Sequence, residues 1–222
     1  MQFTYHIESG TNSLIVKDDI YRYLFKARRH KINDEIFFRN LSDDFVYKYV
    51  VKDISRKDAT LFLESKEIKI VQSSKNLHIA WCIVDPKTVE KYITSLNEIG
   101  VDKITFVYSS FSQKNFKPNI DKLNKILINS SQQCGRSSLM KLEVSENLKT
   151  FLQSYPDTKI LDFSKSNISN NIEVQTILIG TEGGFSNDER ELFKKENILG
   201  LDSNLILRSE TAAISVASKI LL

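Results

Sequence analysis

The chain has 222 residues, of which 41% are hydrophobic and 27% are charged, with only seven glycines and three prolines. This composition excludes disordered and collagen-like chains. The sequence also contains no uncharged apolar run of about 18 residues, the length that a helix needs to cross a bilayer. The net charge of +3 is nearly neutral, so a polyanionic partner would have to be bound by a local basic patch.

The N-terminus carries neither the basic nor the apolar region of a signal peptide, and we therefore expect a cytoplasmic protein. The two cysteines, Cys82 and Cys134, lie far apart, and the three histidines are scattered along the chain. We expect no metal site and no structural disulfide from this set of residues. Both cysteines lie in apolar stretches, which predicts small buried side chains.

The first 70 residues have the pattern of a small β domain. Short β-branched and aromatic runs at residues 36–38, 45–51 and 59–63 are separated by turn-forming residues. Their spacing predicts a small barrel, and polar residues 72–76 predict a linker. We therefore expect two domains, at residues 1–70 and 71–222.

A basic segment lies within this first domain, at residues 22–31. It carries five basic side chains and no acidic one, interleaved with Tyr23 and Phe25. The basic residues are Arg22, Lys26, Arg28, Arg29 and Lys31. Such residues neutralise phosphates, and aromatic rings stack on unpaired bases. The alternative is a solvated helix face whose apolar residues pack inward.

From residue 77 onward, apolar runs alternate with helical patterns, which predicts a parallel α/β sheet. Strands are expected at residues 77–84, 103–108, 159–163, 174–179 and 204–207. Helices are expected at residues 86–99, 121–134, 146–155, 186–197 and 210–221. Asp85 and Gly100 have the residue types of an N-cap and a C-cap for the first of these helices.

The sharpest local signal follows the strand predicted at residues 174–179. Three of the seven glycines fall at residues 180–184, and Ser186 with Glu189 forms a capping-box pattern for the next helix. Glycines at the carboxyl end of a strand let backbone amides approach a ligand closely. A tight turn without a ligand explains the spacing equally well. A second strand-to-helix junction, at residues 206–212, places Arg208 and Glu210 before a helix rich in small residues.

These two segments resemble the signature of a known family. Residues 180–186 (GTEGGFS) and 206–212 (ILRSETA) closely resemble the RsmE family of bacterial 16S ribosomal RNA uridine-N3 methyltransferases, within the SPOUT superfamily. Residues 96–101 and 132–136 are similar to two further segments of that family, in the same order. This chain departs from the family pattern at Thr181, where proline is usual, and at residues 201–203, where a Leu-Gly pair is usual.

The resemblance implies an α/β fold: a SPOUT-type, trefoil-knotted parallel sheet preceded by a small PUA-like β-barrel domain that binds RNA. It implies a homodimer that uses S-adenosylmethionine to methylate N3 of a uridine in 16S ribosomal RNA or the small ribosomal subunit. It assigns ten residues to the cofactor site. They are Ile179, Gly180, Glu182, Gly183, Gly184, Leu201, Ile206, Leu207, Thr211 and Ala212.

The chemistry requires that uridine N3 lose its proton or that the resulting anion be stabilised. We assign the stabilising role to Arg208, with Glu210 as runner-up for base or orienter. Both residues could instead be structural, pairing with each other or capping the last helix. Arg136 is a candidate for RNA contact, or simply an exposed arginine after a helix end.

Two other functions fit the same sequence. A ribose 2′-O-methyltransferase of the same superfamily would share the cofactor site, and a non-catalytic RNA-binding assembly factor would share the fold. The intact glycine loop at residues 180–184 argues against a loss of cofactor binding.

Overall fold

The computed structural model describes residues 2–169 and 173–222. Contacts within the chain divide it into two units, one made of the residues up to 72 together with 128–139, and the other of residues 73–127 and 140–222. The division into two domains after residue 70 remains a prediction.

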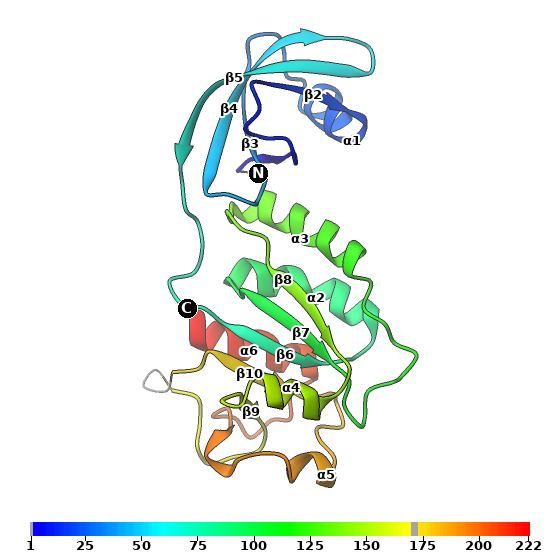
Figure 1. Ribbon diagram of the computed structural model, residues 1–222, viewed down its shortest axis with the longest axis vertical. Coiled ribbons are helices and arrows are strands. Elements are labelled where there is room, and N and C mark those ends of the chain that lie inside the picture. Colours follow the sequence, from blue (N-terminus) through cyan, green and yellow to red (C-terminus); the bar gives the residue numbers. More distant parts are fainter. Residues whose placement is uncertain (1, 170–172) are drawn as a thin grey trace. The chain divides into compact units, whose positions relative to one another are not determined.

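The first unit contains a curled five-stranded sheet with the order β1-β3-β4-β5-β2 (Figure 1). Its strands are β1 Thr4–Tyr5, β2 Ser13–Lys17, β3 Glu35–Arg39, β4 Phe45–Ile54 and β5 Asp58–Ile68. The three predicted runs form β3, β4 and β5, whereas β1 and β2 were not predicted. β1 pairs parallel to β3, and the other pairs are antiparallel. β1 and β2 are the two end strands of this sheet, which curls into a half-barrel, in agreement with the small barrel predicted.

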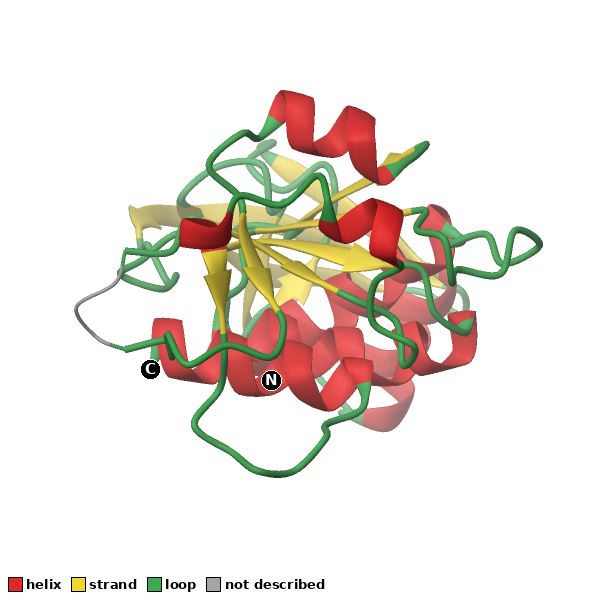
Figure 2. Cartoon of the chain, turned by 90° about the horizontal axis from the view of Figure 1, so that it is seen from below, coloured by secondary structure: helices red, strands yellow, loops and turns green. Residues whose placement is uncertain are grey.

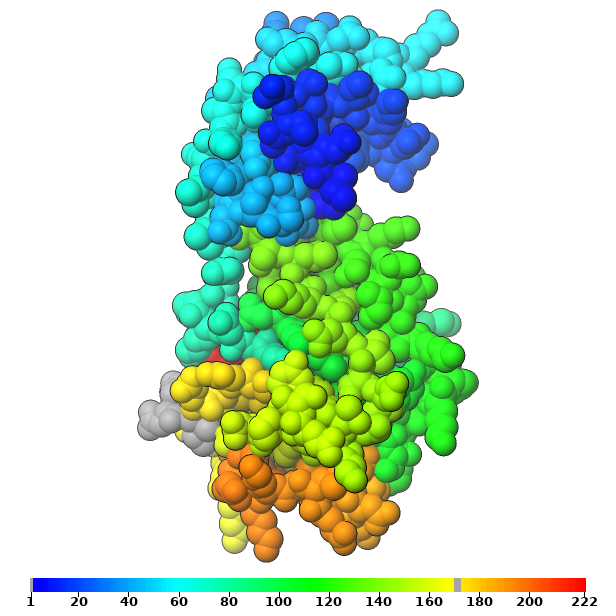
Figure 3. Space-filling model, viewed as in Figure 1, coloured from blue at the N-terminus to red at the C-terminus, as the bar shows by residue number. Residues whose placement is uncertain are grey.

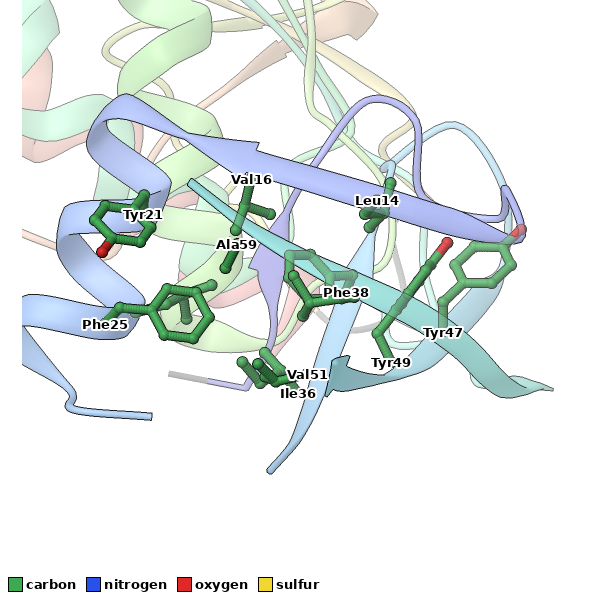
Figure 4. Packing of buried hydrophobic residues seen from close by; sticks show 12 residues of the cluster. Leu14, Val16, Tyr21, Phe25, Ile36, Phe38, Tyr47, Tyr49, Val51 and Ala59 are labelled. Carbon is green, nitrogen blue, oxygen red and sulfur yellow. The ribbon is translucent and has the colours of Figure 1, made fainter. Parts of the chain in front are cut away.

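The core of this unit is aromatic (Figure 4). Phe38 and Tyr49 pack edge to face, with ring centroids 5.5 Å apart. A helix, α1 Asp18–Tyr21, continues as a π-helix at Arg22–Ala27 and brings Tyr21 and Phe25 into the core, stacked at 5.4 Å. In β2, alternate side chains point to the core, because successive residues of a strand face opposite sides of the sheet.

The second unit is built on a six-stranded parallel sheet with the order β11-β9-β10-β6-β7-β8. The strands are β6 His78–Cys82, β7 Lys103–Val107, β8 Lys141–Ser145, β9 Lys159–Leu161, β10 Thr176–Ile179 and β11 Ile198–Leu199. Helices cover both faces of this sheet (Figure 2). All five residues of β6 are therefore buried, which explains its nearly continuous apolar sequence.

Four of the predicted helices are present: α2 Pro86–Ile99, α3 Ile120–Cys134, α4 Leu148–Ser154 and α6 Ser209–Leu221. The side chain of Asp85 caps α2 by accepting a hydrogen bond from Thr88 N at 3.3 Å, and Gly100 ends the helix with a φ of 109°. Much of α6 is buried, and in Figure 3 almost none of it (red) is visible. Among the described residues, no helix is long and apolar enough to cross a membrane.

Both cysteines are free thiols. Cys82 is buried in β6, and burial raises the pKa of its thiol to about 12. The neutral thiol packs as a small apolar side chain, as predicted. Cys134, at the end of α3, is only partly buried.

The helix predicted at residues 186–197 is wrong beyond its first turn. The capping box of Ser186 and Glu189 does form, but α5 Asn187–Arg190 ends after four residues and a short 3₁₀ helix follows at Lys195–Asn197. The chain turns because Phe193 packs into the core against Phe185, with ring centroids 5.0 Å apart. Packing of one aromatic side chain thus overrides the local helix signal.

The strand predicted at residues 204–207 is also wrong, and β8 was missed. Residues 204–207 have no regular structure, and the side chains of Leu205 and Ile206 are 77% and 81% exposed. The edge position in the sheet is occupied instead by β11, which pairs with β9. Strand propensity does not decide which of two apolar runs finds a partner strand.

A close backbone crossing follows β11. Gly200 N donates to Ser166 O at 2.8 Å, and Ile168 N donates to Gly200 O at 2.9 Å. A Cβ atom on Gly200 would lie only 2.5 Å from the carbonyl oxygen of Ser164. Residue 200 must therefore be glycine for segments 161–168 and 198–201 to pass each other at this distance.

Candidate active site

Three loops follow neighbouring parallel strands and meet at the carboxyl edge of the second sheet. They are residues 162–168 after β9, 180–184 after β10 and 200–208 after β11. Together they enclose a cavity of about 460 Å³. This is the edge at which open α/β sheets bind ligands, and the volume lies in the range of small-molecule sites.

The glycine loop is shaped by backbone bonds. Gly184 N donates to Thr181 O at 2.9 Å, and Gly184 has a φ of 68°, a conformation that L side chains rarely adopt. A Cβ on Gly180 would lie 3.2 Å from both Gly184 Cα and Phe185 Cζ. The loop therefore folds back on itself tightly and presents backbone groups to the cavity.

A buried hydrogen-bond chain ties this loop to the last helix. Trp81 Nε1 donates to Ser209 Oγ at 2.8 Å, and Ser209 Oγ donates to Gly180 O at 2.5 Å. Trp81 and Ser209 are buried and Gly180 is half-buried, and an unpaired indole N–H or hydroxyl in such a place is costly. Ser209 thus fixes the start of α6 against the glycine loop.

An ion pair ties the glycine loop to the loop after β9. The Arg190 guanidinium binds the Asp162 carboxylate through both of its terminal nitrogens, and its Nε donates to Phe185 O at 3.2 Å. The Asp162 side chain is nearly buried, so water screens this pair less than one at the surface. Arg190 and Asp162 both line the cavity and hold two of its walls together.

Nine of the ten residues assigned to the cofactor site line this cavity, and the exception, Thr211, is exposed on the first turn of α6. The assignment missed the wall formed by residues 161–164. It also missed other residues that line the cavity, namely Thr181, Phe185, Arg190, Gly200, Ser203, Leu205 and Ser209. The signal for residues 161–164 was available, because they end a strand predicted to lie in the same parallel sheet.

Arg208 and Glu210 flank Ser209 at the start of α6 but differ in exposure. Arg208 is exposed, and its side chain makes no ion pair and no capping hydrogen bond with any described residue. The structural alternatives, pairing with Glu210 and capping the helix, are therefore wrong. Glu210 is buried, and its Oε2 has no hydrogen-bond partner in the described part of the chain.

The basic residues of segment 22–31 lie in the first unit, and all five are exposed. Leu24 and Phe25 are buried and Tyr23 is half-buried against the core, as the helix-face alternative expected. The five basic side chains nevertheless remain exposed on the surface. Arg22 pairs with Asp19, and Arg28 lies over the Tyr23 ring while its Nε donates to the phenol at 2.8 Å.

Arg136 does not have the exposure expected of an arginine after a helix end. It is only 4% exposed. A guanidinium in this position could not reach RNA without a rearrangement, so its assignment to RNA binding gains no support.

Comparison with known proteins identifies the fold class. Residues 71–221 match the model of an RNA methyltransferase domain, and residues 16–64 match that of an RNA methyltransferase PUA domain. A ribosomal RNA small subunit methyltransferase E from Neisseria gonorrhoeae, solved with S-adenosylmethionine, has a TM-score of 0.81 at 17% identity and covers 98% of this chain and 95% of its own. A Legionella pneumophila protein solved with bound SAM has the same TM-score at 22% identity and the same coverage. The chain therefore combines an RNA methyltransferase domain with a PUA domain and has the α/β fold of these solved structures.

Full-length relatives narrow the class to one family. The ribosomal RNA small subunit methyltransferase E of Helicobacter pylori is 38% identical over 98% of both chains, and that of Buchnera aphidicola is 30% identical over 90% of this chain and 83% of its own. The chain belongs to the RsmE family.

Replacing Ser209 by alanine tests the hydrogen-bond chain. We expect Ser209→Ala to lower the free energy of unfolding by about 1–3 kcal/mol, because Trp81 Nε1 and Gly180 O both lose a buried partner. Urea denaturation measures this change. Ser215→Ala, on the same helix and without a side-chain hydrogen bond among the described residues, is the control. Equal stabilities for both variants and the wild type would contradict the assigned role.

Proposed function

We propose that this protein transfers a methyl group from S-adenosylmethionine to N3 of a uridine in 16S ribosomal RNA. The observation that carries the proposal is the cavity at the carboxyl edge of the sheet, lined by nine of the ten residues that the family resemblance assigns to the cofactor, in a chain of that family. The substrate also places the reaction in the cytoplasm, where ribosomal subunits are assembled.

The lining of the cavity suits the proposed cofactor. The side chains of Ile179, Leu201, Leu207 and Ala212 provide an apolar surface for an adenine ring, and the glycine loop provides backbone donors and acceptors for its polar edge. When bound, S-adenosylmethionine supplies a methyl group already activated by a sulfonium. The protein therefore has to align the acceptor and manage its proton.

Arg208 is suited to stabilise the anion that forms when uridine N3 loses its proton. Its guanidinium stays charged at neutral pH, is exposed, and directly follows cavity-lining Leu207. The N-terminus of α6, a helix of 13 residues, adds a partial positive charge at the same place. Glu210 remains the runner-up for proton acceptor, because its buried Oε2 is free of hydrogen bonds to described residues.

Methyl transfer to 16S ribosomal RNA, followed by nucleoside mass spectrometry, tests this function. We expect N3-methyluridine from the wild type and a decrease in kcat of about 100- to 1,000-fold for Arg208→Ala. Arg208→Lys, which keeps the charge, should retain part of the rate, and the Kd for S-adenosylmethionine should not change in either variant. A 2′-O-methyl product would assign the chain to the sibling activity, and absence of cofactor binding would favour the assembly factor. An Arg208→Ala variant with wild-type kcat would refute the role of Arg208.

The basic segment supports RNA binding by the first unit. We expect the triple variant Lys26→Ala/Arg29→Ala/Lys31→Ala to bind RNA more weakly and to reduce the slope of log K against log salt by about 2, because each phosphate contact to a single strand contributes about 0.7. Filter binding at several salt concentrations measures the slope. The control replaces exposed Lys87, Lys91 and Lys125 of α2 and α3 by alanine. An equal loss in both triple variants would show that total charge, and not this segment, determines affinity.

We also propose a homodimer. Leu205 and Ile206, exposed beside the cavity, are apolar side chains that a partner subunit would cover. Sedimentation velocity should give twice the 25.6 kDa of one chain, and Leu205→Asp should shift the distribution toward monomer. Leu192→Asp, at another exposed leucine, should not. A monomeric wild type at micromolar concentration would exclude this assembly.

A further inference from the structure

The loop that follows β7, residues 109–119, is hydrogen-bonded to residues 186–189, which directly follow the glycine loop and lie about 75 residues further along the chain. Ser110 N donates to Glu189 Oε1 at 2.7 Å, and Ser186 Oγ donates to Ser110 Oγ at 3.1 Å. The start of the loop is further closed by Ser112 N, which donates to Ser109 O at 3.0 Å. These bonds fix the position of the next side chain, Phe111.

The ring of Phe111 lies directly on the glycine loop. A Cβ atom on Gly183 would lie 3.2 Å from Phe111 Cδ2 and 3.4 Å from Cγ, so the ring occupies the space that a side chain at residue 183 would need. Gly183 itself lines the cofactor cavity. Phe111 is nevertheless 52% exposed. A large apolar ring is thus held in place beside the site with much of its surface in solvent.

The rest of the loop has the chemistry of an RNA-binding surface. It carries exposed Lys114 and Lys117 and no acidic residue. Its fold is held by Tyr108, whose hydroxyl donates to Phe116 O at 2.9 Å. Exposed lysines beside an exposed aromatic ring suit a single-stranded nucleotide, because the ammonium groups neutralise phosphate and the ring stacks on the base.

On the basis of the function proposed above, we infer that Phe111 is the stacking surface for the target uridine and that Glu189 positions it. A base stacked on Phe111 lies beside Gly183, at the wall of the cavity from which the methyl group is transferred. Stacking uses the face of the base and leaves its N3 edge free to point at that cavity.

Glu189 acts through the loop and does not touch the base. Its carboxylate is buried, with Oε1 bound to Ser110 N and Oε2 accepting from Ser186 N at 2.9 Å. One side chain therefore joins the cofactor loop to the proposed base-stacking loop. Glu189→Gln exchanges one of these acceptor oxygens for a donor and should loosen the connection.

The test compares kcat/KM for 16S ribosomal RNA with the Kd for S-adenosylmethionine in a series of variants. Phe111→Ala should lower kcat/KM about tenfold to hundredfold, the value of one lost base stack, while the Kd for the cofactor stays within twofold of the wild type. Phe111→Tyr and Phe111→Trp should restore most of the activity. Leu192→Ala, which shortens another exposed apolar side chain of the same unit, should have no effect.

A double-variant cycle tests the role of Glu189. Glu189→Gln should lower kcat/KM in the wild-type background but add little in the Phe111→Ala background, because the positioned ring is already missing. Fully additive losses would reduce Glu189 to a structural residue.

Photocrosslinking gives a second measurement that does not depend on activity of a variant. RNA with 5-bromouridine at the methylated position should form its adduct on Phe111 of the wild-type protein. Wild-type kcat/KM in Phe111→Ala, or an adduct elsewhere, would overturn the inference about Phe111. A wild-type protein that does not methylate RNA would overturn the proposed function instead.

Discussion

The cofactor cavity depends on one close contact, the passage of the backbone at Gly200 beside Ser164 and Ser166. Because Gly200 has no side chain, segments 161–168 and 198–201 share backbone hydrogen bonds. That crossing brings the loop after β11 over the end of β10, where the glycine loop begins. Without it, residues 201–207 would have no wall to face and the cavity would be open on one side.

The crossing alone would leave the loops loosely attached, and three side chains fix them. Ser209 joins the glycine loop to α6, Arg190 joins it to the loop after β9, and Glu189 joins it to the loop after β7. Ser209 is part of the sequence signature, and Glu189 and Arg190 follow its first segment by three and four residues. The signature and the residues that follow it therefore include side chains that hold the loops of the site in place as well as residues that line the cavity. This explains why polar residues occur there that need not contact a ligand.

The two units contribute different chemistry to one proposed reaction. The first offers exposed cations on a helix whose aromatic residues pack into its core. The second offers the cavity, with exposed Arg208 beside it and exposed Lys114 and Lys117 on the loop after β7. A nearly neutral chain can serve a polyanionic substrate in this way, because affinity depends on where the charges lie and not on their sum.

The sequence by itself predicted the alternation of strands and helices in most of the second unit, the caps of α2, and nine of the residues that line the cavity, because these follow from short-range periodicity and from a signature of adjacent residues. It did not determine where α5 ends or whether residues 204–207 form a strand. Those outcomes depend on Phe193 packing against Phe185 and on which segment pairs with β9. The contacts of Phe111, Asp162 and Gly200 could not be predicted either, although the predicted strand that ends beside Asp162 indicated the edge of the sheet on which it lies. Each acquires its role from a neighbour that is distant along the chain, and only the tertiary structure brings these partners into contact.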